Sequence, residues 1–155
     1  MIRNTAVTVC GPLNVNKLGV TYVHEHLMVK PQLPDEYYIP YTLDDEAAST
    51  EETRSFSAAG GETLVEMTPI NYGRNVKAYQ RIAQATGVHV ICCTGFHKQL
   101  FMPPWFGDKT DGELYDILMD EVTNGLDDTE IHPGVIKLGT SFEEVTAAEK
   151  RSIEA

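Results

Sequence analysis

The sequence predicts an α/β fold in which helices cover a parallel β-sheet, and three observations support this. Short apolar runs of β-prone residues alternate with segments of helical periodicity. The chain has 155 residues, 42% hydrophobic and 23% charged, which is the composition of a globular domain with one core. Strands that alternate with helices favour parallel pairing, because each helix returns the chain to the start of the next strand. The predicted strands lie near residues 20–26, 62–68, 88–94 and 134–139.

The segment before the first strand predicts an N-terminal hairpin within residues 1–19. Two short β-prone pieces flank a turn region that contains Gly11 and Pro12. After the first strand, a helix is predicted from Thr42, which is a suitable N-cap residue followed by acidic residues. The Gly60-Gly61 pair is expected to end this helix.

Three further helices follow the second, third and fourth strands. The first of them, within residues 73–87, ends at Gly87 and places four apolar side chains on one face: Val76, Tyr79, Ile82 and Ala83. The next begins with a capping box from Thr110 to Glu113 and ends at Gly125. A second capping box, from Thr146 to Glu149, begins the last helix.

Two architectures satisfy this order of elements. One is a small doubly wound sheet, and the other is part of a (β/α)8 TIM barrel. A complete barrel needs about 250 residues. Four β/α units in 155 residues would be half of one, with residues 1–155 as a single unit.

Charge and hydropathy exclude several classes of function. Twelve basic and 23 acidic side chains give a net charge of -11, which disfavours nucleic acid and anionic membrane surfaces as partners. No apolar run approaches the ~20 residues of a membrane helix, and the N-terminus lacks the apolar core of a signal peptide. We therefore expect a cytoplasmic protein.

The three cysteines agree with a reducing compartment. Cys92 and Cys93 are adjacent in an apolar run, so on a strand they face opposite sides and are expected to act as small core residues. A vicinal metal or redox pair is the alternative, although the CxxC spacing is missing.

The first strand carries an unusual motif, because His24, Glu25 and His26 interrupt its apolar run. Residues two apart on a strand leave from the same face, so both imidazoles point one way and the carboxylate the other. Two adjacent imidazoles at a strand end can ligate one metal ion. A pair of histidines that are hydrogen-bonded within a core is the alternative.

Four segments together resemble the phosphotriesterase-like, lactonase-containing branch of the amidohydrolase superfamily. They are "LGVTYVHEHL", "VEMTPINYGRN", "VHVICCTGFH" and "GVIKLGTS", which match that branch in order. The resemblance implies a metal-dependent hydrolase that cleaves ester, lactone or phosphotriester bonds of small molecules through a metal-bridging hydroxide. It also implies two divalent ions at the C-terminal mouth of a (β/α)8 barrel, zinc being favoured over manganese, cobalt or iron.

The resemblance assigns His24 and His26 to the more buried metal and Lys137 to a bridging position after carboxylation by carbon dioxide. Elementary physics agrees for Lys137. Burial disfavours an ammonium, and a neutral amine can react with carbon dioxide to give a carbamate with two oxygens. A snorkelling or salt-bridged lysine is the alternative.

Other residues receive supporting roles from the resemblance. Phe96 and His97 are expected to line the substrate pocket, and the segment 101–106 forms either an apolar rim or a packing element of the barrel shell. Glu66 and Arg74 are expected to form an ion pair, structural or catalytic. His89 and His132 are not assigned to the site.

The resemblance also implies a histidine from the fifth strand, another from the sixth and a proton-handling aspartate from the eighth, all of which would follow Ala155. We therefore expect a site that is incomplete in this chain, with weak metal binding and little activity. Three explanations are open: the chain is a truncation, a second chain completes the barrel, or two copies of the chain associate. A non-catalytic module that acts by association with a partner chain is the alternative.

Overall fold

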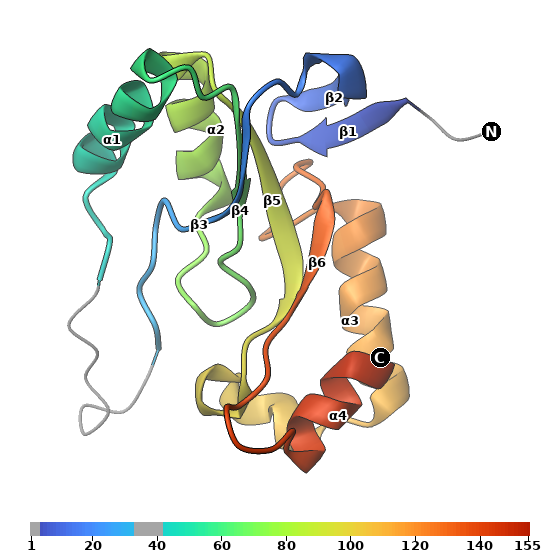
Figure 1. Cartoon of the computed structure of the whole chain (residues 1–155). Coiled ribbons are helices and arrows are strands. Elements are labelled where there is room, and N and C mark those ends of the chain that lie inside the picture. Colours follow the sequence, from blue (N-terminus) through green and yellow to red (C-terminus); the bar gives the residue numbers. More distant parts are fainter. Residues whose placement is uncertain (1–3, 33–41) are drawn as a thin grey trace.

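The structure is a computed structural model that describes residues 4–32 and 42–155. Its centre is a four-stranded sheet in the order β3-β4-β5-β6, and every neighbouring pair is parallel (Figure 1). The strands are β3 (Thr21–Glu25), β4 (Thr63–Glu66), β5 (His89–Phe96) and β6 (Val135–Leu138). This order follows the chain without reversal. A doubly wound sheet reverses its strand order at a switch point, so the observed order is that of half a barrel.

A separate two-stranded sheet precedes the half barrel. Its strands β1 (Thr5–Thr8) and β2 (Gly11–Asn14) are antiparallel, with Thr8 opposite Gly11. A hairpin is thus present in the described part of residues 1–19, which excludes residues 1–3. Its predicted turn was wrong, because Gly11 and Pro12 begin β2 and residues 9–10 form the turn. The backbone N–H of Val9 donates to the carbonyl of Val90 (2.8 Å), which ties the hairpin to β5.

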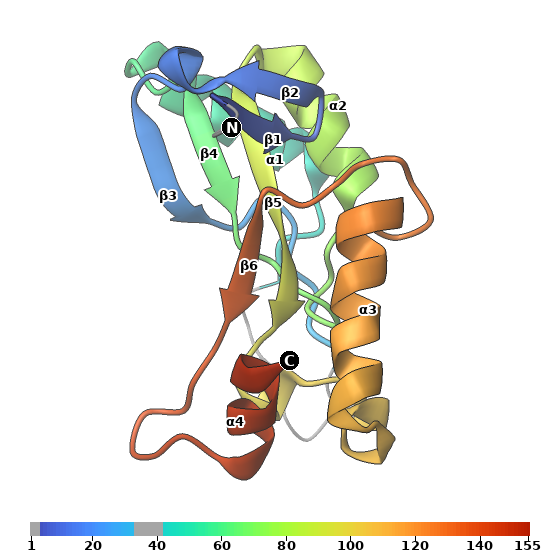
Figure 2. The ribbon, with the colours of Figure 1, turned by 90° about the vertical axis from the view of Figure 1, so that its right-hand side faces the viewer.

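Four helices follow the strands: α1 (Glu46–Ala58), α2 (Val76–Thr86), α3 (Asp111–Asn124) and α4 (Ala147–Glu154). Helix α1 packs on α2, whereas α2 and α3 both pack on β5. Helix α4 lies beyond the C-terminal ends of β5 and β6 and contacts α3 (Figure 2). No helix within the described ranges is long and apolar enough to cross a membrane.

The helix starts were predicted with mixed success. Both capping boxes form, and the helix before Gly87 ends there as predicted, with Gly87 in a left-handed conformation (φ 77°). Thr42 as the first N-cap was wrong, because Asp45 accepts hydrogen bonds from the N–H groups of Ala47 and Ala48. Leu43 explains the delay. Its backbone pairs with Val29 in an antiparallel bridge, so the helix cannot begin before that bridge ends.

The core divides into two main clusters on the helical side of the sheet. The larger one joins β4 and β5 to α2 and includes Tyr79, Ile82 and Cys92, all fully buried. The second joins the end of β5 to α3 through Phe96, Phe106, Leu114 and Leu118. Cys93 is also fully buried, and both cysteines are free thiols, as expected of core residues. Burial raises the pKa of Cys92 to about 12, so this thiol stays protonated and unreactive.

The predicted ion pair between Glu66 and Arg74 was wrong. Arg74 instead forms two bidentate pairs, with Glu121 of α3 (2.6 and 3.0 Å) and with Asp127 in the following loop (2.6 and 3.0 Å). The Arg74 side chain is only 5% exposed. These partners hold its pKa above the ordinary arginine value, against the opposing effect of burial. Arg74 therefore joins the loop after β4 to the C-terminal end of α3 and to the loop that follows it.

Replacement of Arg74 by Ala should destabilise the fold strongly, because the largely buried carboxylate of Glu121 (14% exposed) would lose its partner. We expect a loss of about 3–5 kcal/mol in the free energy of unfolding, measured by urea titration. Arg81→Ala is the matched control, since Arg81 forms a similar bidentate pair with Glu46 but is 56% exposed. Equal losses in the two variants would contradict the structural role of Arg74.

Glu149 fastens α4 to two other segments. Its carboxylate accepts from the N–H groups of Gln99 (3.0 Å), Ser141 (3.1 Å) and Thr146 (2.9 Å), and from the Ser141 hydroxyl (2.6 Å). Burial would raise the pKa of Glu149, but these hydrogen bonds outweigh it and lower the pKa to about 2. The carboxylate thus stabilises the fold in its ionised form.

The contribution of Glu149 should depend on pH in a defined direction. Because its pKa is about 2 in the fold and 4.5 without neighbours, its stabilisation is complete above about pH 4.5 and disappears as the pH falls towards 2. Glu149→Gln should therefore cost about 1.5–3 kcal/mol near neutrality and progressively less in acid, measured by urea unfolding. Glu113→Gln, in the exposed capping box of α3, should cost less. A loss for Glu149→Gln that is independent of pH would contradict this account.

Candidate metal centre

Residues from the two edge strands of the sheet meet over its concave face. Lys137 of β6 and His24 of β3 are 113 positions apart, yet Nζ and Nε2 lie 3.3 Å apart. In a flat sheet, strands separated by two others lie about 14 Å apart, because neighbouring strands are spaced by about 4.8 Å. Only a curved sheet brings these side chains together. The curvature of a half barrel thus creates the candidate centre.

Close packing of β5 and β6 also depends on a glycine beside Lys137. Gly95 is the register partner of Lys137 and has a left-handed φ of 107°. A Cβ at position 95 would lie 2.1 Å from the Lys137 carbonyl oxygen. Any side chain there would push β6 away from the sheet and move Lys137 with it.

His24 and His26 lie side by side, as the spacing predicts, with ring centroids 5.3 Å apart. The strand is not regular, however. Between Tyr22 and Glu25 the register with β4 shifts, so β3 carries an extra residue. This bulge lets Tyr22 stack on Phe56 of α1, on the helical side, while both imidazoles occupy the other side (centroids of Tyr22 and Phe56, 6.4 Å).

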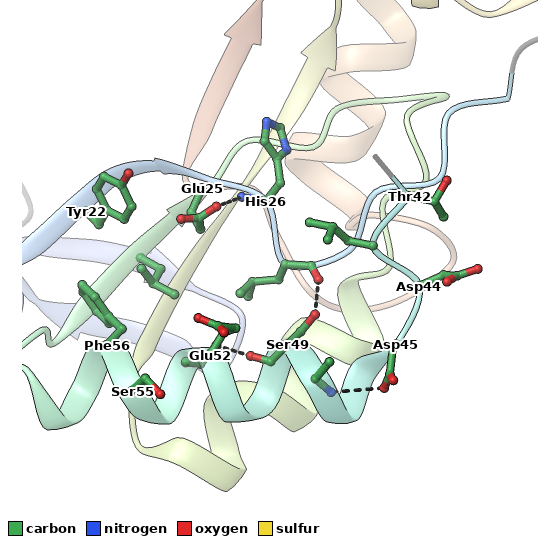
Figure 3. Close-up of a pocket in the computed structure, with 15 residues that line it drawn as sticks. Tyr22, Glu25, His26, Thr42, Asp44, Asp45, Ser49, Glu52, Ser55 and Phe56 are labelled. Carbon is green, nitrogen blue, oxygen red and sulfur yellow. Dashed lines mark hydrogen bonds between the residues drawn. The ribbon is translucent and has the colours of Figure 1, made fainter. Parts of the chain in front are cut away.

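On its helical side, the end of β3 borders a cavity of about 600 Å³ that lies between this strand and α1 (Figure 3). Glu25 lines this cavity and accepts a hydrogen bond from the His26 N–H (2.8 Å). Ser49 and Glu52 of α1 face the same space. Of the three candidate metal residues, only His26 borders the cavity. The cavity is therefore separate from the contact between His24 and Lys137.

Both imidazoles are held in the neutral form that a metal ligand requires. Burial lowers the pKa of His26 to about 4, and the nearby His24 and Lys137 add to this effect. Burial also lowers the pKa of His24, with a further contribution from Lys137. The Nδ1 atom of His26 lies 2.8 Å from the Thr68 hydroxyl, which in turn contacts Glu66 (2.6 Å). The His26 ring is therefore fixed by a polar neighbour rather than by packing alone.

Lys137 is a buried amine without a carboxylate partner in the described part of the chain. The residue is 8% exposed, and no Asp or Glu of residues 4–32 or 42–155 forms an ion pair with it. Burial lowers the pKa of Lys137, although Cys93 and Glu66 act in the opposite direction. This geometry does not match the salt-bridged alternative. It favours an amine that is more readily deprotonated than an ordinary lysine.

An aromatic wall flanks the imidazoles. Tyr72 lies between His26 and His97, with ring centroids at 5.9 and 4.7 Å, and Phe101 closes the group at 4.6 Å from His97. Phe101 lies beside the candidate centre and Phe106 packs in the shell under α3, and both side chains are buried in core clusters. Phe96 is fully buried in that same shell cluster. Its position is that of a packing residue.

The described residues contain no group of three or more His, Cys, Asp or Glu side chains that could hold a metal ion. Two imidazoles and one lysine are what converge. A neutral amine next to two neutral imidazoles is a chemically suitable donor set once the amine has become a carbamate, which adds two oxygens. The residues present therefore fit a divalent metal, provided that Lys137 contributes.

The curved parallel sheet and the polar residues at its strand ends define half of a (β/α)8 barrel with a candidate metal centre. The sequence profile of the phosphotriesterase family matches residues 4–155, and the chain belongs to this family. A phosphotriesterase-related protein of Nematostella vectensis is 31% identical over all of this chain and 53% of its own length. A phospho-furanose lactonase of Mycoplasmopsis synoviae is 31% identical over 99% of this chain and 48% of its own length.

The solved structures agree with this assignment. A lactonase from Listeria monocytogenes superimposes with a TM-score of 0.89 at 28% identity, over 96% of this chain and 51% of its own. This likeness confirms the predicted half barrel. The chain thus spans about half the length of the relatives it matches.

Sequence reasoning missed the partners of His26. Thr68 and Tyr72 received no role, and Glu66 was given the wrong partner. One signal was available, since Glu66 and Thr68 are two residues apart at the end of a strand and so share a face.

Proposed function

We propose that the chain provides the metal-binding half of a hydrolase that acts on the lactone, ester or phosphotriester bond of a small molecule. The observation that carries the proposal is the convergence of His24, His26 and Lys137 across the curved sheet. Family membership supports it, since a phospho-furanose lactonase and an N-acetyltaurine hydrolase of Danio rerio are among the relatives (31% identity each).

His24 and His26 would hold the metal through neutral imidazole nitrogens, and Lys137 would bridge two ions as a carbamate. Carboxylation joins the Lys137 nitrogen to the carbon of carbon dioxide and releases one proton, and an uncharged amine is required for it. Zinc is the favoured metal because imidazole suits it, with manganese, cobalt or iron as alternatives. When bound, divalent ions would lower the pKa of a water molecule and polarise the bond to be cleaved.

The aromatic wall would exclude water from one side of the reacting bond. In His97, Nδ1 accepts the N–H of Lys98 (2.7 Å), so the neutral ring carries its proton on Nε2. Burial lowers the pKa of His97 to about 4, which keeps the ring neutral. His97 could then donate one hydrogen bond to a substrate oxygen. Phe96, which we predicted as a second lining residue, would support the wall from the core.

A second candidate function is a non-catalytic module that acts through association. Within the described residues, β3 and β6 each pair with a single neighbour in the sheet. Both strands expose apolar side chains, including Val23 (68% exposed) and Ile136 (58% exposed). Open strand edges with apolar neighbours favour pairing with another chain, either a second copy or a chain that completes the barrel.

Metal binding by the purified chain should depend on Lys137 and on bicarbonate. We expect titratable zinc binding that weakens by more than about tenfold in Lys137→Met or His24→Ala, measured by competition with a chromophoric chelator. Added bicarbonate should strengthen binding in the wild type and have no effect in Lys137→Met. His89→Gln is the control, because position 89 begins β5 at the far end of the sheet.

Two outcomes would contradict this proposal. One is zinc binding that is unchanged in Lys137→Met. The other is binding that fails equally in His89→Gln. Hydrolysis of an aryl ester or a lactone, measured with zinc or manganese, separates the two candidate functions. Turnover at the level of a complete barrel enzyme would exclude the non-catalytic module. We expect little turnover and less than stoichiometric metal after dialysis.

Self-association should depend on the edge strands. Val23→Lys combined with Ile136→Lys should lower the weight-average mass in sedimentation equilibrium, because a charge on each edge opposes strand pairing. Val15→Lys is the matched control, since Val15 lies outside the sheet and is 38% exposed. An unchanged mass in the double variant would show that the edges are not the contact surface.

A further inference from the structure

A chain of hydrogen bonds runs from a buried carboxylate to one of the candidate metal ligands. Glu66 Oε1 lies 2.6 Å from Thr68 Oγ1, which lies 2.8 Å from His26 Nδ1. Glu66 and Thr68 are both fully buried. The mechanism proposed above does not use either side chain, and burial of an ionisable group without a role is costly.

The carboxylate of Glu66 is fixed from two directions. The backbone N–H of Leu27, which follows β3, donates to Oε1 (3.2 Å). The backbone N–H of Thr68, which follows β4, donates to Oε2 (3.0 Å). Glu66 therefore acts as an acceptor that joins the ends of two neighbouring strands. Its position relative to Thr68 is set by the backbone rather than by a flexible side chain.

The position of each proton follows from a count of donors. A hydroxyl group has one proton, and besides the Tyr79 hydroxyl two acceptors lie near that of Thr68: Glu66 Oε1 at 2.6 Å and the Met28 carbonyl at 3.2 Å. The shorter contact has the length of a charge-assisted bond, so the proton points at Glu66. The remaining contact of Thr68 Oγ1 is then that of an acceptor. His26 Nδ1 must carry a proton and donate it.

We propose that Glu66 and Thr68 are positioning residues that hold His26 in the Nδ1–H tautomer. In a neutral imidazole with a proton on Nδ1, Nε2 has a free lone pair. His26 would then bind metal through Nε2 without first moving a proton. This role in metal binding rests on the proposed function, whereas the choice of tautomer is a property of the chain itself.

The test reads the tautomer directly in the metal-free protein. Nitrogen-15 spectra of histidine-labelled chain distinguish protonated from unprotonated ring nitrogens, and comparison with His26→Gln identifies the signals of His26. The measurement is made at about pH 8, which lies above the pKa of about 7 to which burial raises Glu66, so that its carboxylate is mostly ionised. Thr68→Val removes the hydroxyl at similar volume, and Thr68→Ser keeps it. Zinc affinity is measured in parallel by chelator competition.

We expect the Nδ1–H tautomer of His26 in the wild type and in Thr68→Ser, and a mixture of tautomers in Thr68→Val. Zinc affinity should fall about 10–100-fold in Thr68→Val and be retained in Thr68→Ser. A wild-type His26 protonated on Nε2, or a tautomer that is unchanged in Thr68→Val, would overturn the proposal. The wild-type spectrum decides this even if Thr68→Val fails to fold. If the tautomer responds as expected but wild-type chain binds no zinc, the positioning role stands and the proposed metal centre fails.

Discussion

Curvature of the parallel sheet is the constraint on which the candidate centre depends. His24 and Lys137 belong to strands at opposite edges, and they meet only because the sheet bends towards its concave face. The bend follows from the right-handed twist of parallel strands and from the core that fills the opposite face, where Tyr79 and Ile82 of α2 are fully buried. Gly95 then permits β6 to approach β5 beside Lys137. Packing on the helical side thus determines chemistry on the other side.

Removal of a charged group from water is costly, and three ionisable side chains in the interior meet this cost in different ways. Arg74 is surrounded by carboxylates, which keep its charge, and it serves as a structural tie. Glu66 is held by hydrogen bonds from backbone and hydroxyl donors, yet burial still dominates and raises its pKa to about 7. Lys137 has an imidazole beside it and no carboxylate partner among the described residues. A buried amine without a carboxylate partner is stabilised little in its charged form. Lys137 therefore differs chemically from a lysine that is held in a structural ion pair.

Local signals explain how much of the fold could be predicted from the sequence. The order of the strands, their parallel pairing, both capping boxes and the stop at Gly87 depend on short-range patterns, and the structure confirms them. The predictions were wrong where a residue far away in the sequence determines the local structure. Asp45 replaces Thr42 as N-cap because Leu43 pairs with Val29, and Arg74 selects Glu121 and Asp127, which are some fifty residues away in the chain. The bulge in β3 likewise depends on the fit to β4.

Within the candidate centre, one feature depends on local sequence and another depends on the whole sheet. The pairing of His24 with His26 follows from strand periodicity, but their distance from Lys137 is set by the whole sheet. A ligand that bridges β3 and β6 would bind the curved sheet better than a flattened one, so binding and curvature are thermodynamically linked. Pairing of the two strand edges with another chain would favour the same curvature. Association and metal binding should therefore support each other in this fold, because both depend on how β3 and β6 are held relative to one another.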